Sequence, residues 1–242
     1  MVDNKVATLG WGRFILQFVT VTLVFLAASA PAVIMFGMTS PGLLGSVAGS
    51  MAAALLLCWF WLRKDGALAE AWDMGRPAIG WGRTLAVGAL WAGLIIAWFQ
   101  VGTLMTRQLG LGAPEVAAVL DFVTESPASL LLWIVVVAWF TAGLGEELLY
   151  RGFLMDRLNR LPGLAGKMWL VIFIQAVLFG ISHGYQSLAG VLITGVVGFG
   201  LGYLRVHSGG NLWACVIAHA MVDTLMMGTA YAGKMGMLPV AG

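Results

Sequence analysis

The chain has 242 residues, of which 60% are hydrophobic and only 10% are charged, and its mean hydropathy is +0.93. Soluble domains carry about 25% charged residues, so this composition excludes a soluble protein and predicts an integral membrane protein. The formal net charge of +2 comes without a basic patch interleaved with aromatics, which argues against nucleic acid as a partner. The length favours a single integral membrane domain, residues 1–242, over two domains.

Seven apolar segments approach the ~20 residues that a membrane-spanning helix needs. We therefore predict an all-α fold, a polytopic membrane helix bundle with seven transmembrane helices. A further segment, Glu146–Leu161, is mixed in character. It either extends the fourth span or stands as a separate helix, and the count becomes eight if it crosses by itself. The seven predicted spans are Phe14–Phe36, Leu44–Leu62, Leu85–Met105, Ala128–Gly143, Met168–Ser182, Leu188–Leu204 and Leu212–Ala232.

The first predicted span has one feature of a secretory signal. Ala28-Ser29-Ala30 resembles a cleavage site, but the apolar run continues to Phe36 and suits a spanning helix better than a short signal-peptide core. We expect an uncleaved first span. Outside the spans, Ala67–Trp72 and Leu111–Phe122 are predicted to form short interfacial helices.

Basic residues are distributed unevenly between the two sides of the predicted bundle, and such asymmetry sets orientation in membranes. Arg107 and Lys234 lie on one side. The other side carries the more heavily charged loops. We therefore predict a cytoplasmic N-terminus and, with seven spans, an external C-terminus. The expected location is the bacterial inner (plasma) membrane. The basic residues on that side are Lys5, Arg13, Arg63, Lys64, Arg76, Arg83, Arg157, Arg160, Lys167 and Arg205.

Small residues give two structural expectations. Gly198 and Gly202 form a GxxxG spacing, which lets helices approach closely in lipid; we expect packing inside the bundle rather than a homodimer seam, and the oligomeric state stays open. Cys58 and Cys215 lie inside apolar runs and are predicted to be small buried residues, not a disulfide or a metal site.

Three polar clusters interrupt the apolar segments, and ionisable groups in such a setting usually mark function. The first contains Glu146, Glu147 and Arg151. Glu147 and Arg151 are four residues apart on one helix face and can pair, which would neutralise a costly buried charge. Glu146 points about 100° away around the helix and keeps no local partner. An alternative is that both glutamates solvate a wet helix end, but apolar residues flank them on both sides.

The second cluster is Phe179 and His183, one turn apart at the end of an apolar segment. A turn is predicted at Pro162-Gly163, with Glu146 16 residues before Pro162 and His183 20 residues after Gly163. An antiparallel helix pair with arms of nearly equal length would bring Glu146 and His183 to a similar depth.

The third cluster is His219 and Asp223, again four residues apart on one face. An aspartate there can accept from a ring N–H and so orient the histidine. Cys215 lies on the same stripe, but a Cys215/His219/Asp223 nucleophile system is disfavoured because residues stacked along one helix converge poorly on a carbonyl. His207, in a charged turn, is interpreted as a surface residue.

Two mechanisms use such a set. Without a metal, Glu146 and His183 would deprotonate a water that attacks a peptide carbonyl, while His219 and a neighbour stabilise the oxyanion. With a metal, Glu146, His183, His219 and Asp223 would hold Zn²⁺ and leave a position open for water. No HExxH motif is present, which weakens the usual zinc-protease interpretation but leaves open a metal assembled from separate helices.

At these clusters the sequence resembles the CPBP family of intramembrane proteases, which includes the eukaryotic CAAX prenyl endopeptidase and bacterial bacteriocin-processing or immunity proteins. The resemblance covers about residues 142–227. The family pattern EExxxR, FxxxH and HxxxN or HxxxD is matched here by Glu146-Glu147…Arg151, Phe179…His183 and His219…Asp223.

The family is called a metalloprotease by name, but its best-understood member resembles a glutamate-dependent enzyme without a metal, so the resemblance favours no cofactor over Zn²⁺. It also implies roles for these residues. Glu146 would be the general base, His183 its partner in activating water, and His219 with Asp223 the oxyanion-stabilising pair; Glu147, Arg151 and Phe179 would support them. The CAAX endopeptidase has Asn at the last position, whereas an ionised Asp223 cannot donate a hydrogen bond. Asp223 is therefore protonated, orients His219, or binds a metal.

The predicted function is an intramembrane endopeptidase that acts on a membrane-associated protein or peptide within the lipid bilayer. One alternative is a non-catalytic membrane immunity or scaffold protein that retains the motifs. Another is a proton-coupled transporter that uses the same groups as a relay, although the two halves of the chain show no paired broken helices. The presence of all four candidate residues favours catalysis.

Overall fold

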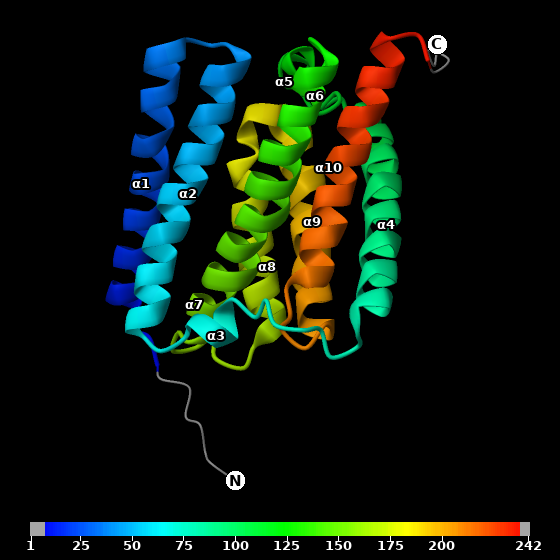
Figure 1. Cartoon of the computed structure of the whole chain (residues 1–242). Coiled ribbons are helices and arrows are strands. Elements are labelled where there is room, and N and C mark those ends of the chain that lie inside the picture. Colours follow the sequence, from blue (N-terminus) through cyan, green and yellow to red (C-terminus); the bar gives the residue numbers. More distant parts are fainter. Residues whose placement is uncertain (1–7, 238–242) are drawn as a thin grey trace.

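The computed structural model describes residues 8–237, and this range contains helices and no strand; Lys5, counted above among the basic residues, lies outside it. Figure 1 shows the helices side by side in one bundle. In chain order the elements are α1 (Trp11–Phe36), α2 (Ser40–Lys64), α3 (Leu68–Ala71), α4 (Trp81–Gln108), α5 (Ala117–Val123), α6 (Pro127–Trp133), the π-helical η1 (Ile134–Leu154), α7 (Met155–Asn159), α8 (Met168–Ser182), the 3₁₀ turn η2 (Gly184–Gln186), α9 (Ser187–His207) and α10 (Trp213–Lys234).

Each of the seven predicted spans is helical, but they do not all have the length of a span. Among residues 8–237, six helices are long and apolar enough to cross a membrane, so the predicted count of seven or eight is not confirmed. The exception is α8, which has 15 residues. At 1.5 Å per residue it is about 22 Å long, short of the ~30 Å hydrocarbon core.

The fourth predicted span continues without a break through the mixed segment that follows it. Pro127–Asn159 forms one helix of 33 residues, which decides between the two alternatives for Glu146–Leu161 in favour of an extension. Ser126 caps its start by accepting a hydrogen bond from the Ser129 backbone N–H at 3.0 Å, and Pro127 suits the first turn. The middle of this helix is π-helical, a backbone form that occurs most often at functional sites.

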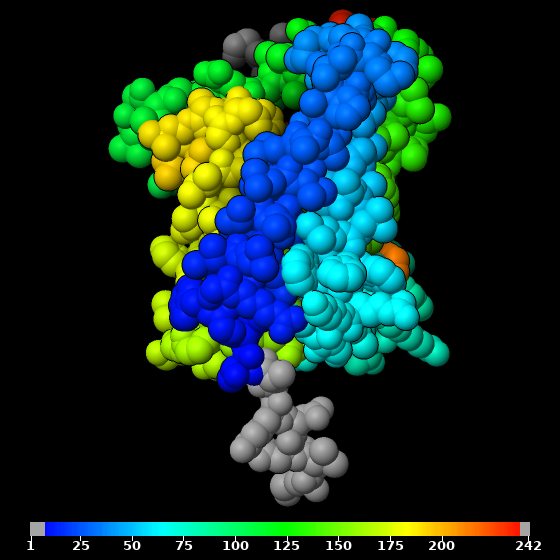
Figure 2. Space-filling model, turned by 90° about the vertical axis from the view of Figure 1, so that its left-hand side faces the viewer, coloured from blue at the N-terminus to red at the C-terminus, as the bar shows by residue number. Residues whose placement is uncertain are grey.

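The arrangement of the helices separates a lipid-facing hairpin from a packed centre. Helix η1 runs through the middle of the bundle, with α8 and α9 behind it and α4 and α10 beyond it (Figure 1). Helices α1 and α2 cover one side of the molecule (Figure 2), and only Gln17 and Val21 of α1 are buried. The N-terminal end of α1 and the C-terminal end of α10 lie at opposite ends of the bundle (Figure 1).

A buried charge network joins the helix ends near α3 and α7. Arg157, predicted above as a loop residue, is fully buried and donates to Asp65 Oδ2 at 2.7 Å as well as to Asp156. Arg160 donates to Glu70 Oε2 at 2.7 Å and to Asp156 at 2.9 Å. Burial by itself would lower the pKa of Arg160, but hydrogen bonds and charges from Asp156 and Glu70 outweigh it and raise that pKa.

The GxxxG spacing packs inside the bundle, as predicted. A Cβ on Gly198 would lie 2.9 Å from Phe179 Cδ1, and a Cβ on Gly202 would lie 2.8 Å from Gln175 Nε2. Both contacts are between α9 and α8, so the missing side chains let these two helices meet. The predicted burial of Cys58 and Cys215 is also found, and both are free thiols.

Candidate active site

Glu147 is the buried centre of the site. Its Oε1 accepts from Arg151 Nη1 at 3.0 Å and from His219 Nδ1 at 2.8 Å. The side chains of Glu147 and Arg151 are both 0% exposed. The pair predicted from the four-residue spacing is therefore present, and the same carboxylate also connects η1 to α10.

Arg151 is held from two further helices. Its Nη2 donates to the Gly198 carbonyl of α9 at 3.3 Å, and Gln175 Nε2 donates to the same oxygen at 2.7 Å. The guanidinium lies 4.3 Å from the centroid of the Phe179 ring, a cation–π contact. Gln175 was missed by the sequence analysis, although a polar residue inside the apolar α8 carries the same signal that marked the other clusters.

The orientation of His219 differs from the expectation. The sequence suggested that Asp223 accepts from its ring, whereas Nδ1 hydrogen-bonds Glu147. An ionised carboxylate only accepts, so Nδ1 carries a proton and Nε2 is the free ring nitrogen. Nε2 lies 3.9 Å from Glu146 Oε2, which places the two neighbouring glutamates around one imidazole.

Close packing of η1 on α10 brings Glu147 and His219 within hydrogen-bond distance. A Cβ on Gly143 would lie 2.7 Å from Ala220 Cβ and 2.7 Å from the Ala138 carbonyl oxygen. Ala220 directly follows His219, so any side chain at Gly143 pushes the site helices apart.

We expect Gly143→Ala to lower the melting temperature, because overpacking a filled contact typically costs about 1–3 kcal/mol. The matched control is Gly93→Ala in α4, where a Cβ meets nothing within 4 Å and a helical Gly→Ala change is worth about 0.5–1 kcal/mol in favour of folding. Thermal unfolding of both purified variants in detergent measures the difference. Equal melting temperatures for the two variants would contradict the close-packing argument.

Glu146 is the available carboxylate of the pair. Its side chain is 23% exposed, and Oε2 is buried without a hydrogen-bond partner in the part of the chain that the structure describes. Glu147 also has a buried Oε2 without a partner, but its Oε1 binds the Arg151 cation and the His219 ring N–H, whereas Glu146 pairs with no Arg or Lys of the described residues. The two adjacent glutamates therefore sit in different environments, as the sequence analysis predicted.

His183 ends α8 and shares an aromatic neighbour with His219. Its Nδ1 lies 2.8 Å from the Phe179 carbonyl oxygen, which can only accept, so Nε2 is left to accept from another group. The Phe179 ring centroid lies 4.7 Å from that of His183 and 6.1 Å from that of His219, so Phe179 is a neighbour of both rings. No hydrogen bond joins Glu146 to His183 within residues 8–237. The two residues lie in the same region of the bundle, as predicted from the hairpin, but they do not bind each other directly.

Asp223 belongs to the same region, one turn beyond His219 on α10. It lies close enough to Glu146, His219 and His183 to interact with their charges. Tyr185, which the sequence analysis missed, stacks on His183 with ring centroids 6.0 Å apart, and its hydroxyl oxygen accepts from Gln186. A tyrosine two residues after the histidine gave no pattern that could have marked it.

Metal ligation was an alternative in the sequence analysis. Across residues 8–237 no three His, Cys, Asp or Glu side chains are grouped closely enough to hold one ion. This donor arrangement does not fit a three-ligand zinc site, and the steps proposed below use no metal.

Cys215 and His207 lie outside the site. Cys215 Sγ donates to the Leu201 carbonyl at 3.4 Å and so faces α9, away from an arrangement with His219 and Asp223. His207 is exposed, as predicted, and bonds to the Tyr203 carbonyl at 3.0 Å.

Residues 128–225 match the sequence model of a family described as type II CAAX prenyl endopeptidase Rce1-like. The matched interval runs from α6 into α10 and contains Glu146, His183, His219 and Asp223. No curated protein and no solved structure shows a significant match to the chain.

Proposed function

We propose, on the premise that residues 128–225 belong to the Rce1-like family of type II CAAX prenyl endopeptidases, that this membrane protein is an intramembrane endopeptidase. Its substrate would be a membrane-associated protein or peptide. The observation that carries the proposal is the unequal pair of carboxylates. Glu147 is fully buried and is bound through Oε1 to Arg151 and His219. Glu146 is partly exposed, and its Oε2 accepts no hydrogen bond from the described residues and lies 3.9 Å from His219 Nε2.

Water activation is assigned to Glu146 and His183. Glu146 accepts a proton from the attacking water. His183 accepts a hydrogen bond from the same water through Nε2, because Nδ1 is engaged with the Phe179 carbonyl. The resulting oxygen attacks the peptide carbonyl carbon. Glu146 then returns the proton to the leaving nitrogen as the C–N bond breaks, giving a carboxylic acid and an amine.

Stabilisation of the oxyanion is assigned to His219. With Nδ1 donating to Glu147, a second ring proton on Nε2 makes an imidazolium that donates toward the reaction centre. The carboxylates of Glu147 and Glu146 lie next to Nδ1 and Nε2 of this ring. Arg151 balances the charge of Glu147, so the buried set is not left with an excess of negative charge.

The proposed orientation places the N-terminal end of α1 on the cytoplasmic side of a bacterial plasma membrane. Arg157 and Arg205, counted as loop charges above, are buried, so the surface asymmetry depends on exposed residues. Those at the α3 and α7 end include Arg63, Lys64, Arg76, Arg83 and Lys167, against Arg107 and Lys234 at the other end. This bias still follows the positive-inside rule.

The test is cleavage of membrane-anchored peptides by the purified protein in proteoliposomes, read by mass spectrometry. Peptides with and without a lipid anchor separate the substrate classes. We expect His183→Ala to lower the rate about 10²- to 10⁴-fold, the usual contribution of an acid–base group. His207→Ala, a change of the exposed histidine, should cleave at the wild-type rate.

The same assay distinguishes the metal-free mechanism from the metal-dependent one. With a chelator present, the metal-free mechanism predicts an unchanged rate. Loss of activity that Zn²⁺ restores would contradict it and reinstate Glu146, His183, His219 and Asp223 as ligands. Cleavage that persists in both His183→Ala and the Glu146 variant described in the Discussion would contradict the proposed site.

A further inference from the structure

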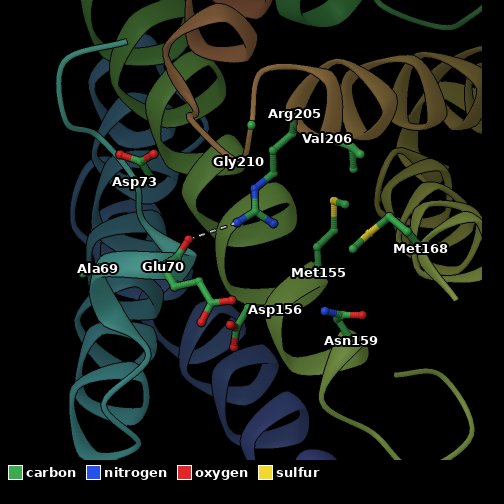
Figure 3. Close-up of a pocket in the computed structure, with 11 residues that line it drawn as sticks. Ala69, Glu70, Asp73, Met155, Asp156, Asn159, Met168, Arg205, Val206 and Gly210 are labelled. Carbon is green, nitrogen blue, oxygen red and sulfur yellow. Dashed lines mark hydrogen bonds between the residues drawn. The ribbon is translucent and has the colours of Figure 1, made fainter. Parts of the chain in front are cut away.

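A cavity of about 340 Å³ opens at the end of the bundle where α3, α7 and the last turn of α9 meet. Figure 3 shows its lining side chains. None of the four candidate catalytic residues lines it, so this cavity is separate from the proposed protease site.

Arg205 is the buried cation of this cavity. Its residue is 9% exposed, and Nη2 reaches only the backbone carbonyls of Glu70 at 3.4 Å and Ala71 at 3.3 Å. In the range 8–237, Nε has no hydrogen-bond partner, and no carboxylate lies within ion-pair distance of the guanidinium. In Figure 3 the side chain extends from α9 into the space between Glu70 and Met155. A buried guanidinium without an anion is costly, and a bound anionic group would satisfy it.

The carboxylates of the lining are not equivalent. Asp156 and Glu70 are already neutralised by Arg157 and Arg160. Asp73 accepts from the Gly75 N–H at 3.1 Å and from Asn211 Nδ2 at 3.3 Å, and no cation of the described residues pairs with it. The cavity therefore carries one unmatched positive charge and one unmatched negative charge.

A single ligand with both charges would complete the cavity. Met155, Met168 and Val206 add an apolar wall, and the cavity lies where membrane-spanning helices end. A small soluble ion would satisfy Arg205 but neither Asp73 nor this wall. A phospholipid head group at the membrane surface satisfies all three features.

We propose that the cavity binds the head group of a phospholipid with a primary ammonium, such as phosphatidylethanolamine. The phosphate lies on the Arg205 guanidinium, and the ammonium lies toward Asp73. The glycerol and the first acyl methylenes lie along Met155, Met168 and Val206.

The test measures lipid retention by native mass spectrometry after the purified protein is exposed to detergent mixed with phosphatidylethanolamine, phosphatidylcholine or phosphatidylglycerol. We expect wild type to prefer phosphatidylethanolamine at least fivefold over the other two. Arg205→Gln should lower retention of phosphatidylethanolamine about tenfold. Asp73→Asn should retain lipid but lose the preference, because only the ammonium contact is removed. The matched controls are the exposed residues Arg76→Gln and Asp121→Asn, which should behave as wild type.

Several outcomes would overturn the proposal. Equal retention of all three lipids by wild type, or an unchanged preference in Asp73→Asn, would exclude ammonium recognition. Competition by free phosphoethanolamine without any lipid retention would show that the ligand is soluble, and equal competition by inorganic phosphate would show a plain anion site. Asp73 is only partly buried, so its variant keeps the test decisive if Arg205→Gln does not fold.

Discussion

Replacing Glu146 by Gln is expected to lower the rate of peptide-bond hydrolysis about 10²- to 10⁴-fold, because an amide cannot take a proton from water. Folding should be nearly unaffected. Glu146 Oε2 accepts no hydrogen bond from the residues that the structure describes, so the substitution removes no hydrogen bond there, and we expect the free energy of unfolding to change by less than about 0.5 kcal/mol. The proteoliposome assay and a thermal melt of the same preparation measure the two quantities.

The control for this prediction is Glu125→Gln, a change of an exposed glutamate outside the site, which should leave both quantities unchanged. Glu146→Asp keeps the carboxylate but shortens its reach, so its rate should fall between those of wild type and Glu146→Gln. A fully active Glu146→Gln protein would assign the base to another residue. A large loss of stability would show instead that Glu146 has a structural role.

The adjacent glutamate is expected to behave in the opposite way. Glu147→Ala leaves the fully buried Arg151 without its carboxylate and His219 without its acceptor. Breaking a buried pair from one side typically costs about 3–5 kcal/mol, enough to unfold many domains. We therefore expect a large fall in melting temperature, or failure to accumulate in the membrane, together with loss of cleavage. Unfolding in detergent measures the loss of stability.

A double variant separates the contribution of Glu147 to stability from its contribution to catalysis. Glu147→Leu combined with Arg151→Met removes both charges, and replacing a whole buried pair by apolar residues is often neutral or stabilising. We expect it to recover most of the stability while cleavage stays low, because His219 Nδ1 has lost the group that orients it. Recovery of both stability and activity would show that the Glu147–His219 bond has no catalytic role. A Glu147→Ala protein as stable as wild type would contradict the buried pair itself.

The local parts of the site could be predicted because their geometry is set by neighbours along one helix. Glu147 and Arg151 face the same side at a spacing of four residues, and the structure contains their ion pair. The contact between Glu147 and His219 joins residues 72 positions apart. No spacing rule predicts which of several acceptors a distant ring will choose, and the near one on its own helix, Asp223, was the wrong choice.

The burial of basic residues likewise could not be predicted from the sequence alone. Arg157 and Arg205 follow apolar segments and were counted as loop charges, yet both are buried. Arg157 can be buried because Asp65 and Asp156 reach it from α2 and α7. A hydropathy value is summed over neighbouring residues of the sequence, each treated by itself. A carboxylate that pairs with the arginine from elsewhere in the chain is not included in this sum.

The sequence by itself determined the membrane location, the all-helical class, the positions of the apolar segments and the candidate acid–base residues. These depend on composition and on periodicity within single helices. The tertiary structure decided that α8 is too short for a full span, that η1 is one continuous helix with α6 and α7, and that Glu147 orients His219 while Glu146 stays available. These features depend on how closely helices approach, and at Gly143 that distance is set by a missing side chain against Ala220.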